Sequence, residues 1–85
     1  MASVIASSST PNPDAMKFSL DVTLPAMVNV TDSAAAAGEP FVEAVFAAGG
    51  VAAVFAVNDF VTVTRQPGAP WEPIVDAVTA AAASL

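Results

Sequence analysis

The segment VAAVFAVNDFVTVTR, residues 51–65, decides the fold of this chain. Its two halves, Val51–Val57 and Phe60–Arg65, are rich in valine, phenylalanine and threonine, which pack well on the pleated surface of a β-sheet. Asn58 and Asp59 separate the halves, and both residue types tolerate the left-handed backbone that two-residue turns require. The segment therefore predicts a β-hairpin.

Polar and apolar side chains alternate along a second predicted strand, Ala15–Leu20. Alternation with a period of two indicates a strand with one buried face and one solvent-exposed face. Met16, Phe18 and Leu20 fall on one side of this strand, and Lys17, Ser19 and Asp21 fall on the other.

Two shorter runs are compatible with further strands. Val4–Ser8 is rich enough in apolar and hydroxyl residues to form one, and the turn residues Ser9–Pro13, with two X-Pro bonds, separate it from the strand that follows. Met27–Thr31 fits an additional short strand at a sheet edge.

Two amphipathic helices complete the pattern. The first is expected to begin at Glu39–Pro40, because proline is well tolerated at the first helical position, and to end at Gly49–Gly50. The second is expected to cover Trp71–Leu85. Apolar residues line one face of each helix: Phe41, Val42, Val45 and Phe46 in the first, and Ile74, Val78, Ala81 and Leu85 in the second.

The order of these elements predicts one α+β domain over residues 1–85. Hairpins and helices without βαβ alternation favour a two-layer sandwich, in which both helices cover one face of an antiparallel sheet of four strands, or five if Met27–Thr31 pairs (ββ(β)αββα). The predicted core contains Phe18, Phe46, Val54, Val61, Val63, Ile74 and Val78, with Trp71 at the rim. All five phenylalanines, which also include Phe41, Phe55 and Phe60, are expected to be core residues.

The residue types that are missing exclude much chemistry. The chain has no cysteine and no histidine, so it has no disulfide, no thiolate nucleophile, no zinc site of the usual kind and no cysteine ligand for an iron–sulfur cluster. Tyrosine is absent as well, which leaves eight acids, two cations and hydroxyl groups. We therefore expect no enzyme activity and no bound cofactor or metal.

Charge and hydropathy exclude two classes of partner. A net charge of −6 with Lys17 and Arg65 as the basic residues provides no cluster for nucleic-acid phosphates. The longest charge-free apolar run, Ala44–Val57, is shorter than the roughly 20 residues of a membrane-spanning helix and is broken by two glycines. The N-terminal residues lack the basic region of a signal peptide, so a cytoplasmic protein is expected.

Several motifs, in a fixed order along nearly the whole chain, resemble the N-terminal domain of the Nfu/NifU-type iron–sulfur scaffold family. They are Thr10–Pro13 (TPNP), Lys17-Phe18, Pro40, Gly50-Val51, Asp59-Phe60, Thr62–Thr64 and Trp71. The sequence departs from the family at Glu39, where a helix-capping serine is common, and at Asn58, where a proline or glycine-like residue is common.

The resemblance implies a non-catalytic accessory domain that binds other proteins of iron–sulfur cluster assembly and carries no cluster itself. The cysteine-bearing C-terminal domain of the family has no counterpart in these 85 residues, so the expected partner is a cysteine-bearing assembly or recipient protein. Two alternatives remain. One is a small enzyme that uses the carboxylates of Asp14, Asp59 or Glu72, and the other is a stand-alone relative with no remaining iron–sulfur role.

Five residues are candidates for partner contacts: Thr10, Asn12, Pro13, Lys17 and Asp59. Three of them have a structural alternative. Asn12 could hydrogen-bond its own turn, Asp59 could shape the hairpin turn, and Lys17 could pair with Asp59. The acid pairs on the predicted helices, Glu39/Glu43 and Glu72/Asp76, are interpreted as solvated helix faces. We expect a monomer.

Overall fold

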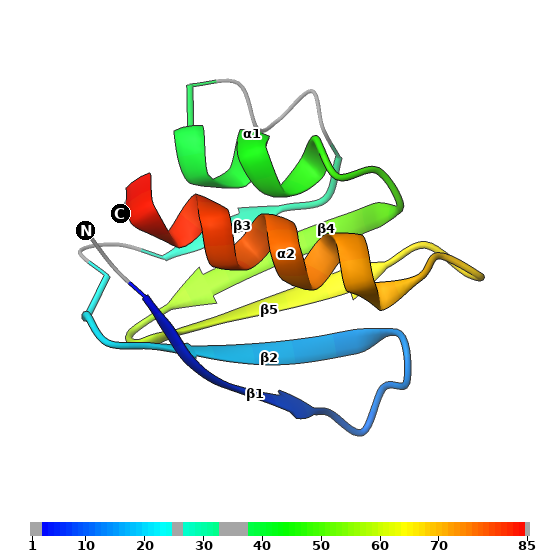
Figure 1. The fold of residues 1–85 in the computed structure, drawn as a ribbon, viewed down its shortest axis with the longest axis horizontal. Coiled ribbons are helices and arrows are strands. Elements are labelled where there is room, and N and C mark those ends of the chain that lie inside the picture. Colours follow the sequence, from blue (N-terminus) through cyan, green and yellow to red (C-terminus); the bar gives the residue numbers. More distant parts are fainter. Residues whose placement is uncertain (1–2, 25–26, 33–37, 85) are drawn as a thin grey trace.

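Residues 3–24, 27–32 and 38–84 are described by the computed structural model of this chain. They form an α+β fold of two layers, a five-stranded antiparallel sheet and a pair of helices that covers it (Figure 1). The strands are β1 (Val4–Ser9), β2 (Ala15–Leu20), β3 (Val28–Val30), β4 (Val51–Val57) and β5 (Phe60–Arg65). The helices are α1 (Pro40–Phe46) and α2 (Trp71–Ala81), and a short 3-10 helix, Ala82–Ser84, follows α2.

The strand order is β1-β2-β5-β4-β3, so β2 joins the N-terminal hairpin to the C-terminal one. Phe18 of β2 lies opposite Val61 of β5. The β4–β5 hairpin closes on a two-residue turn, with Val57 opposite Phe60. Among the non-glycine residues that the structure describes, Asn58 alone has a positive φ, 55°. The left-handed position of the turn therefore falls on the first of its two residues.

One face of the sheet carries the hydrophobic core. Most side chains that alternate onto this face from β2, β5 and β4 are buried, whereas those on the opposite face, apart from Ala15, are exposed or half-buried. Both helices bury their apolar sides against this face. Figure 1 shows the two helices together over the sheet. The largest fully buried side chains are Phe18, Val42, Val45, Val54, Val61, Val63, Ile74 and Val78.

Helix α1 begins at Pro40, as the sequence predicts. Glu39 occupies the N-cap position, but its side chain makes no capping hydrogen bond. The N–H of Gly38 instead donates to Oε1 of Glu43, at 3.1 Å, in the first turn. The helix ends before Gly49, whose φ of 78° a residue with a Cβ rarely adopts.

Three predicted boundaries change. The helix predicted over Trp71–Leu85 is α-helical to Ala81 and then tightens into the 3-10 turn, a common way for a helix to end. Leu85 lies outside the described residues. The first strand extends one residue further than predicted, to Ser9, and the edge strand β3 forms over the three residues Val28–Val30.

The expectation that all five phenylalanines are core residues is wrong for two of them, Phe55 and Phe60. Phe18 and Phe41 are buried, and Phe46, the last residue of α1, is half-buried and packs against the core. Phe55 and Phe60 each lie next to a buried valine in their strand. Since neighbouring residues of a strand point to opposite faces, both rings lie on the face that the helices leave open.

Candidate partner-binding surface

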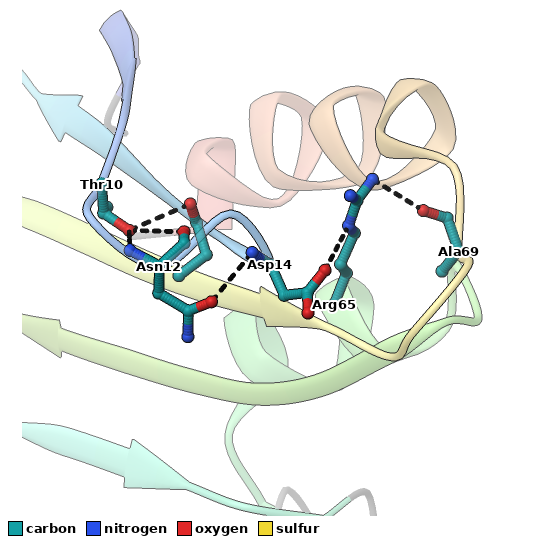
Figure 2. A network of polar contacts seen from close by, with 6 residues as sticks. Thr10, Asn12, Asp14, Arg65 and Ala69 are labelled. Carbon is teal, nitrogen blue, oxygen red and sulfur yellow. Dashed lines mark hydrogen bonds and ion pairs between the residues drawn. The ribbon is translucent and has the colours of Figure 1, made fainter.

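The turn between β1 and β2 is organised around the hydroxyl group of Thr10. This hydroxyl lies 2.9 Å from the carbonyl oxygen of Asn12 and 3.2 Å from that of Ala15, and it can donate to either. It also accepts a hydrogen bond from the N–H of Asn12, at 3.2 Å. A threonine at this position therefore fixes the path of the chain from β1 into β2 (Figure 2).

The side chain of Asn12 holds the same turn from within. Its Oδ1 atom accepts a hydrogen bond from the N–H of Asp14, at 2.9 Å, which is the bonding pattern of an Asx turn. The N–H of Ala15 donates to the carbonyl oxygen of Asn12, at 3.0 Å. The structural alternative for Asn12 is therefore realised. The amide nitrogen of Asn12 points away from the turn in Figure 2 and is available to a partner.

Arg65, the last residue of β5, ties this turn to the start of α2. Its Nε atom donates to Oδ1 of Asp14 at 3.2 Å, and its Nη1 atom donates to the carbonyl oxygen of Ala69 at 3.1 Å (Figure 2). The guanidinium group also lies 5.2 Å from the centre of the Trp71 ring. A planar donor that is held at three points is well suited to fixing a loop in place.

The open face of the sheet is the second part of the surface. A row of directly opposed residues crosses all five strands on this face: Ser8, Lys17, Thr62, Phe55 and Asn29. Residues directly opposite each other in antiparallel strands project to the same side, so these five side chains share one face.

Lys17 and two aromatic rings occupy the centre of this open face. The Nζ atom of Lys17 lies 4.5 Å from the centre of the Phe60 ring, within the range of a cation–π contact. The rings of Phe55 and Phe60 are 6.4 Å apart and tilted by 53°. The predicted ion pair between Lys17 and Asp59 does not form, although the structure describes both residues. The lysine instead extends over apolar surface.

The predicted contact residues do not all lie together. Thr10, Asn12 and Pro13 lie in the β1–β2 turn, at the end of the sheet where Arg65 ends β5. Asp59 lies at the other end, in the β4–β5 turn, where its carbonyl oxygen accepts a hydrogen bond from the N–H of Leu20. Lys17 lies between the two ends.

Sequence reasoning missed Phe55, Phe60 and Arg65 as members of this surface. The signal for the two phenylalanines was present, because strict alternation from the buried Val54 and Val61 places each neighbouring ring on the opposite face. For Arg65 no local signal exists, since its partner Asp14 is 51 residues away in the sequence.

The acids of the alternative enzyme hypothesis are spread apart. Asp14 lies beside the last residue of β5 and Asp59 immediately precedes its first, so about 17 Å of strand separates them at ~3.4 Å per residue. Glu72 is exposed in the first turn of α2. A pocket of about 280 Å³ lies at the start of β4, lined in part by Thr31, Phe46 and Gln66, and it contains none of the three acids.

Comparison with known proteins identifies the family. The family model described as the N-terminal part of scaffold protein Nfu/NifU matches residues 5–84. This chain belongs to that family. The NFU1 iron–sulfur cluster scaffold homolog, mitochondrial, of Drosophila ananassae is 37% identical to it over 68 residues, which cover 76% of this chain and 24% of that protein. NifU-like protein 5, mitochondrial, of Arabidopsis thaliana is 37% identical over 70 residues, which cover 80% of this chain and 26% of that protein.

Solved structures agree with the Nfu/NifU N-terminal fold. A crystal structure of a Staphylococcus aureus protein superposes with a TM-score of 0.76 at 28% identity, covering 93% of this chain and 96% of that one. A solution structure of a NifU-like protein from Saccharomyces cerevisiae gives a TM-score of 0.74 at 20% identity, covering 89% of this chain and 71% of that one. This second likeness concerns the fold alone.

The match covers only part of the length of each curated relative. The names of both relatives describe them as mitochondrial. The chain spans about a quarter of their length. In the part of the chain that the structure describes, no helix is long and apolar enough to cross a membrane. The cytoplasmic location expected from the sequence stays a prediction.

The residues of this chain do not fit an iron–sulfur cluster as a resident group. The sequence contains no cysteine and no histidine, the residues that ligate such clusters. Within residues 3–24, 27–32 and 38–84, no group of three or more acids comes close enough to hold a metal ion.

Proposed function

We propose that this Nfu/NifU N-terminal domain is a non-catalytic accessory domain of iron–sulfur cluster assembly, which binds a cysteine-bearing assembly or recipient protein. A cluster would be carried by that partner, because this chain lacks the ligands for one. The contact surface is the open sheet face around Lys17, together with the Thr10–Asp14 turn at its end.

The observation that carries the proposal is the open face itself. It presents two partly exposed phenylalanine rings and one lysine on a sheet whose other face is covered by the helices over β2, β5 and β4. Aromatic residues are enriched in the centres of protein interfaces, where they bury much area at a small cost in conformational entropy. The Nζ atom of Lys17 lies over Phe60 and forms no ion pair with the neighbouring Asp59, so its charge can meet an acidic group of the partner.

The rigid turn gives this surface a fixed boundary. The hydrogen bonds of Thr10 and Asn12 and the contact of Arg65 with Asp14 hold the turn in one conformation. A surface that is ordered before binding loses little conformational entropy when the partner docks. The outward amide nitrogen of Asn12 would then form a polar contact at the rim of the interface.

The test compares two double variants that change the net charge equally. Asn12→Ala/Lys17→Glu alters the proposed surface, and Ala44→Glu/Ala80→Glu adds two negative charges on exposed helix positions. A cysteine-bearing assembly or recipient protein that co-purifies with the wild-type chain is purified and titrated with each variant by calorimetry. We expect the first variant to bind at least about tenfold more weakly, since a hydrogen bond to a charged group contributes about 1.5–3 kcal/mol.

The control variant should retain wild-type affinity, and both variants should melt cooperatively. Equal loss of binding in the two variants would show that net charge, and not the open face, governs the interaction. Undiminished binding by a folded Asn12→Ala/Lys17→Glu variant would exclude this surface and direct attention to the acidic helices.

A further inference from the structure

Beyond Val4, which packs against the core, the edge strand β1 is uncovered on both of its faces. It ends the sheet beside β2, and five of its six residues are exposed. Ser7 and Ser9 lie opposite Phe18 and Met16, so their side chains point toward the helix side of the sheet, yet both serines are solvent-exposed. The helices therefore end short of β1, which agrees with its peripheral place in Figure 1.

The hydrogen bonds of β2 show which peptide groups of β1 face β2 and which face outward. The N–H of Arg65 donates to the carbonyl oxygen of Asp14, and the N–H of Leu20 donates to the carbonyl oxygen of Asp59. Asp14 and Leu20 both have even numbers, so the even-numbered residues of β2 direct their peptide groups toward β5. Peptide groups alternate along a strand, so Lys17 directs its own toward β1. The donation from the N–H of Asp21 to the carbonyl oxygen of Ser3 agrees with this alternation.

Two residues of β1 consequently present free peptide groups at the sheet edge. Ser8 lies opposite Lys17 and uses its N–H and C=O on β2. Its neighbours Ser7 and Ser9 direct theirs outward, where an additional antiparallel strand would form hydrogen bonds with both. Natural sheets usually protect such an edge with lysine, proline, a β-bulge or a covering element. β1 (VIASSS) has no lysine or proline, and its irregularity, between Val4 and Ala6, lies before Ser7.

We propose that β1 accepts an extended, uncharged or basic segment of a partner protein as a sixth strand of the sheet. Main-chain hydrogen bonds at Ser7 and Ser9 hold the segment, and the small side chains of β1 leave room for larger ones on it. The net charge of −6 favours a basic segment. This inference concerns a different surface from the open face and stands or falls independently of it.

A second copy of this chain is the weaker occupant. Two β1 strands about 20 Å long and about 10 Å thick would bury only ~400 Å² in total, against the roughly 1,200 Å² of a stable protein interface. Each copy also carries a charge of −6, so two copies repel each other. A basic segment of a partner avoids the charge repulsion, and residues on either side of the segment can add contacts beyond the edge strand.

The probe is a synthetic peptide with the sequence of residues 15–20 and two lysines at each end. These six residues already pair with β1 inside the domain, so their side chains are compatible with it. The isotope-labelled chain is titrated with the peptide and followed by amide NMR. We expect the largest shifts and new protection from hydrogen exchange at the amides of Ser7 and Ser9. The same peptide with an N-methyl group on each of the six residues should cause neither effect.

Two protein variants sharpen the test. Ser7→Pro removes one outward N–H and leaves the ladder with β2 intact, and proline is tolerated where an edge strand faces solvent. It should weaken peptide binding about five- to tenfold, which corresponds to one main-chain hydrogen bond. Ser7→Ala keeps the N–H and should bind like wild type. If Ser7→Pro does not fold, the comparison of the unmodified peptide with the N-methylated peptide still tests the proposal.

Three results would overturn the proposal. The first is the absence of shifts in β1 at millimolar peptide, and the second is a set of shifts confined to Lys17, Phe55 and Phe60 on the open face. The third is a shift of Ser7 and Ser9 with protein concentration in the absence of peptide, together with a dimeric mass, which would make a second copy the occupant.

Discussion

Replacing Phe18 with alanine tests the two-sided sheet on which the candidate surface depends. Phe18 is fully buried in β2, between the sheet and the helices. Phe60 provides a matched control, because it lies on the adjacent strand, in the neighbouring register position and on the opposite, open face. The same substitution at the two sites therefore differs only in the side of the sheet from which the ring is removed.

The two substitutions should differ clearly in their cost. Removing a fully buried phenylalanine ring loses its transfer free energy and leaves a cavity, at about 3–5 kcal/mol. Phe60 keeps part of its surface in water, so it loses only part, about 1–2 kcal/mol, of a transfer free energy of roughly 1.5–3 kcal/mol, and solvent fills the space. Its contacts with Phe55 and Lys17 together add about 1 kcal/mol, so Phe60→Ala should cost about 2–3 kcal/mol, less than Phe18→Ala.

Urea unfolding of both variants, followed by far-UV circular dichroism, measures this difference. A domain of 85 residues has a total stability of about 4–13 kcal/mol, so Phe18→Ala should remove at least about a quarter of it. At about 4–8 °C per kcal/mol, its melting temperature should fall by at least about 12 °C. Equal losses for Phe18→Ala and Phe60→Ala would refute the assignment of an open face, since both rings would then be buried.

Three further predictions concern the helix layer, a glycine turn and the binding of an iron–sulfur cluster. Phe41→Ala should destabilise the domain by about 3–5 kcal/mol and Phe46→Ala by only about 1–2 kcal/mol, because Phe41 is buried and Phe46 is half-buried; the reverse order in thermal melts would show that α1 is rotated. Gly50→Ala should cost about 2–3 kcal/mol, since φ is +74° and the new Cβ would meet Cβ of Ala69 at 2.7 Å. Gly49→Ala, with a similar φ and open space around it, should cost only about 1 kcal/mol, and equal losses in chemical unfolding would contradict the steric argument. Anaerobic reconstitution with iron and sulfide should leave the visible spectrum of the purified chain featureless, because it lacks cysteine and histidine; a stoichiometric sulfide-to-iron absorption band would contradict this.

Local patterns in the sequence predicted most of the fold. The alternation around Phe18 correctly gave a strand with one buried face, and Asn58-Asp59 correctly gave the hairpin turn. Phe60 was predicted to lie in the core because it is large and apolar, although its position in the alternating pattern of the strand favours the opposite face. Val61 and Val63 were both predicted to be buried, and strict alternation from them places Phe60 outside.

The candidate surface was less predictable, because it depends on strand order. The contact of Arg65 with Asp14 and that of Lys17 with Phe60 both require β2 to lie next to β5. No local pattern specifies that neighbour, since the two strands are far apart in the sequence. The turn around Asn12 could be read in advance, because an asparagine commonly hydrogen-bonds the backbone two residues ahead.

The placement of β2 beside β5 also constrains the order in which the chain folds. Ser19 pairs with Phe60, so the N-terminal hairpin leaves the ribosome about 40 residues before the strand that completes its sheet. At about 5–20 residues per second, Phe18 stays exposed for about 2–8 s during synthesis, on a two-stranded hairpin that is at best marginally stable alone. Docking of β2 onto the local β4–β5 hairpin is then a late step. Conservative substitutions at Phe18 should accordingly accelerate unfolding more than they slow folding, and a φ-value near one at this position would reverse the order.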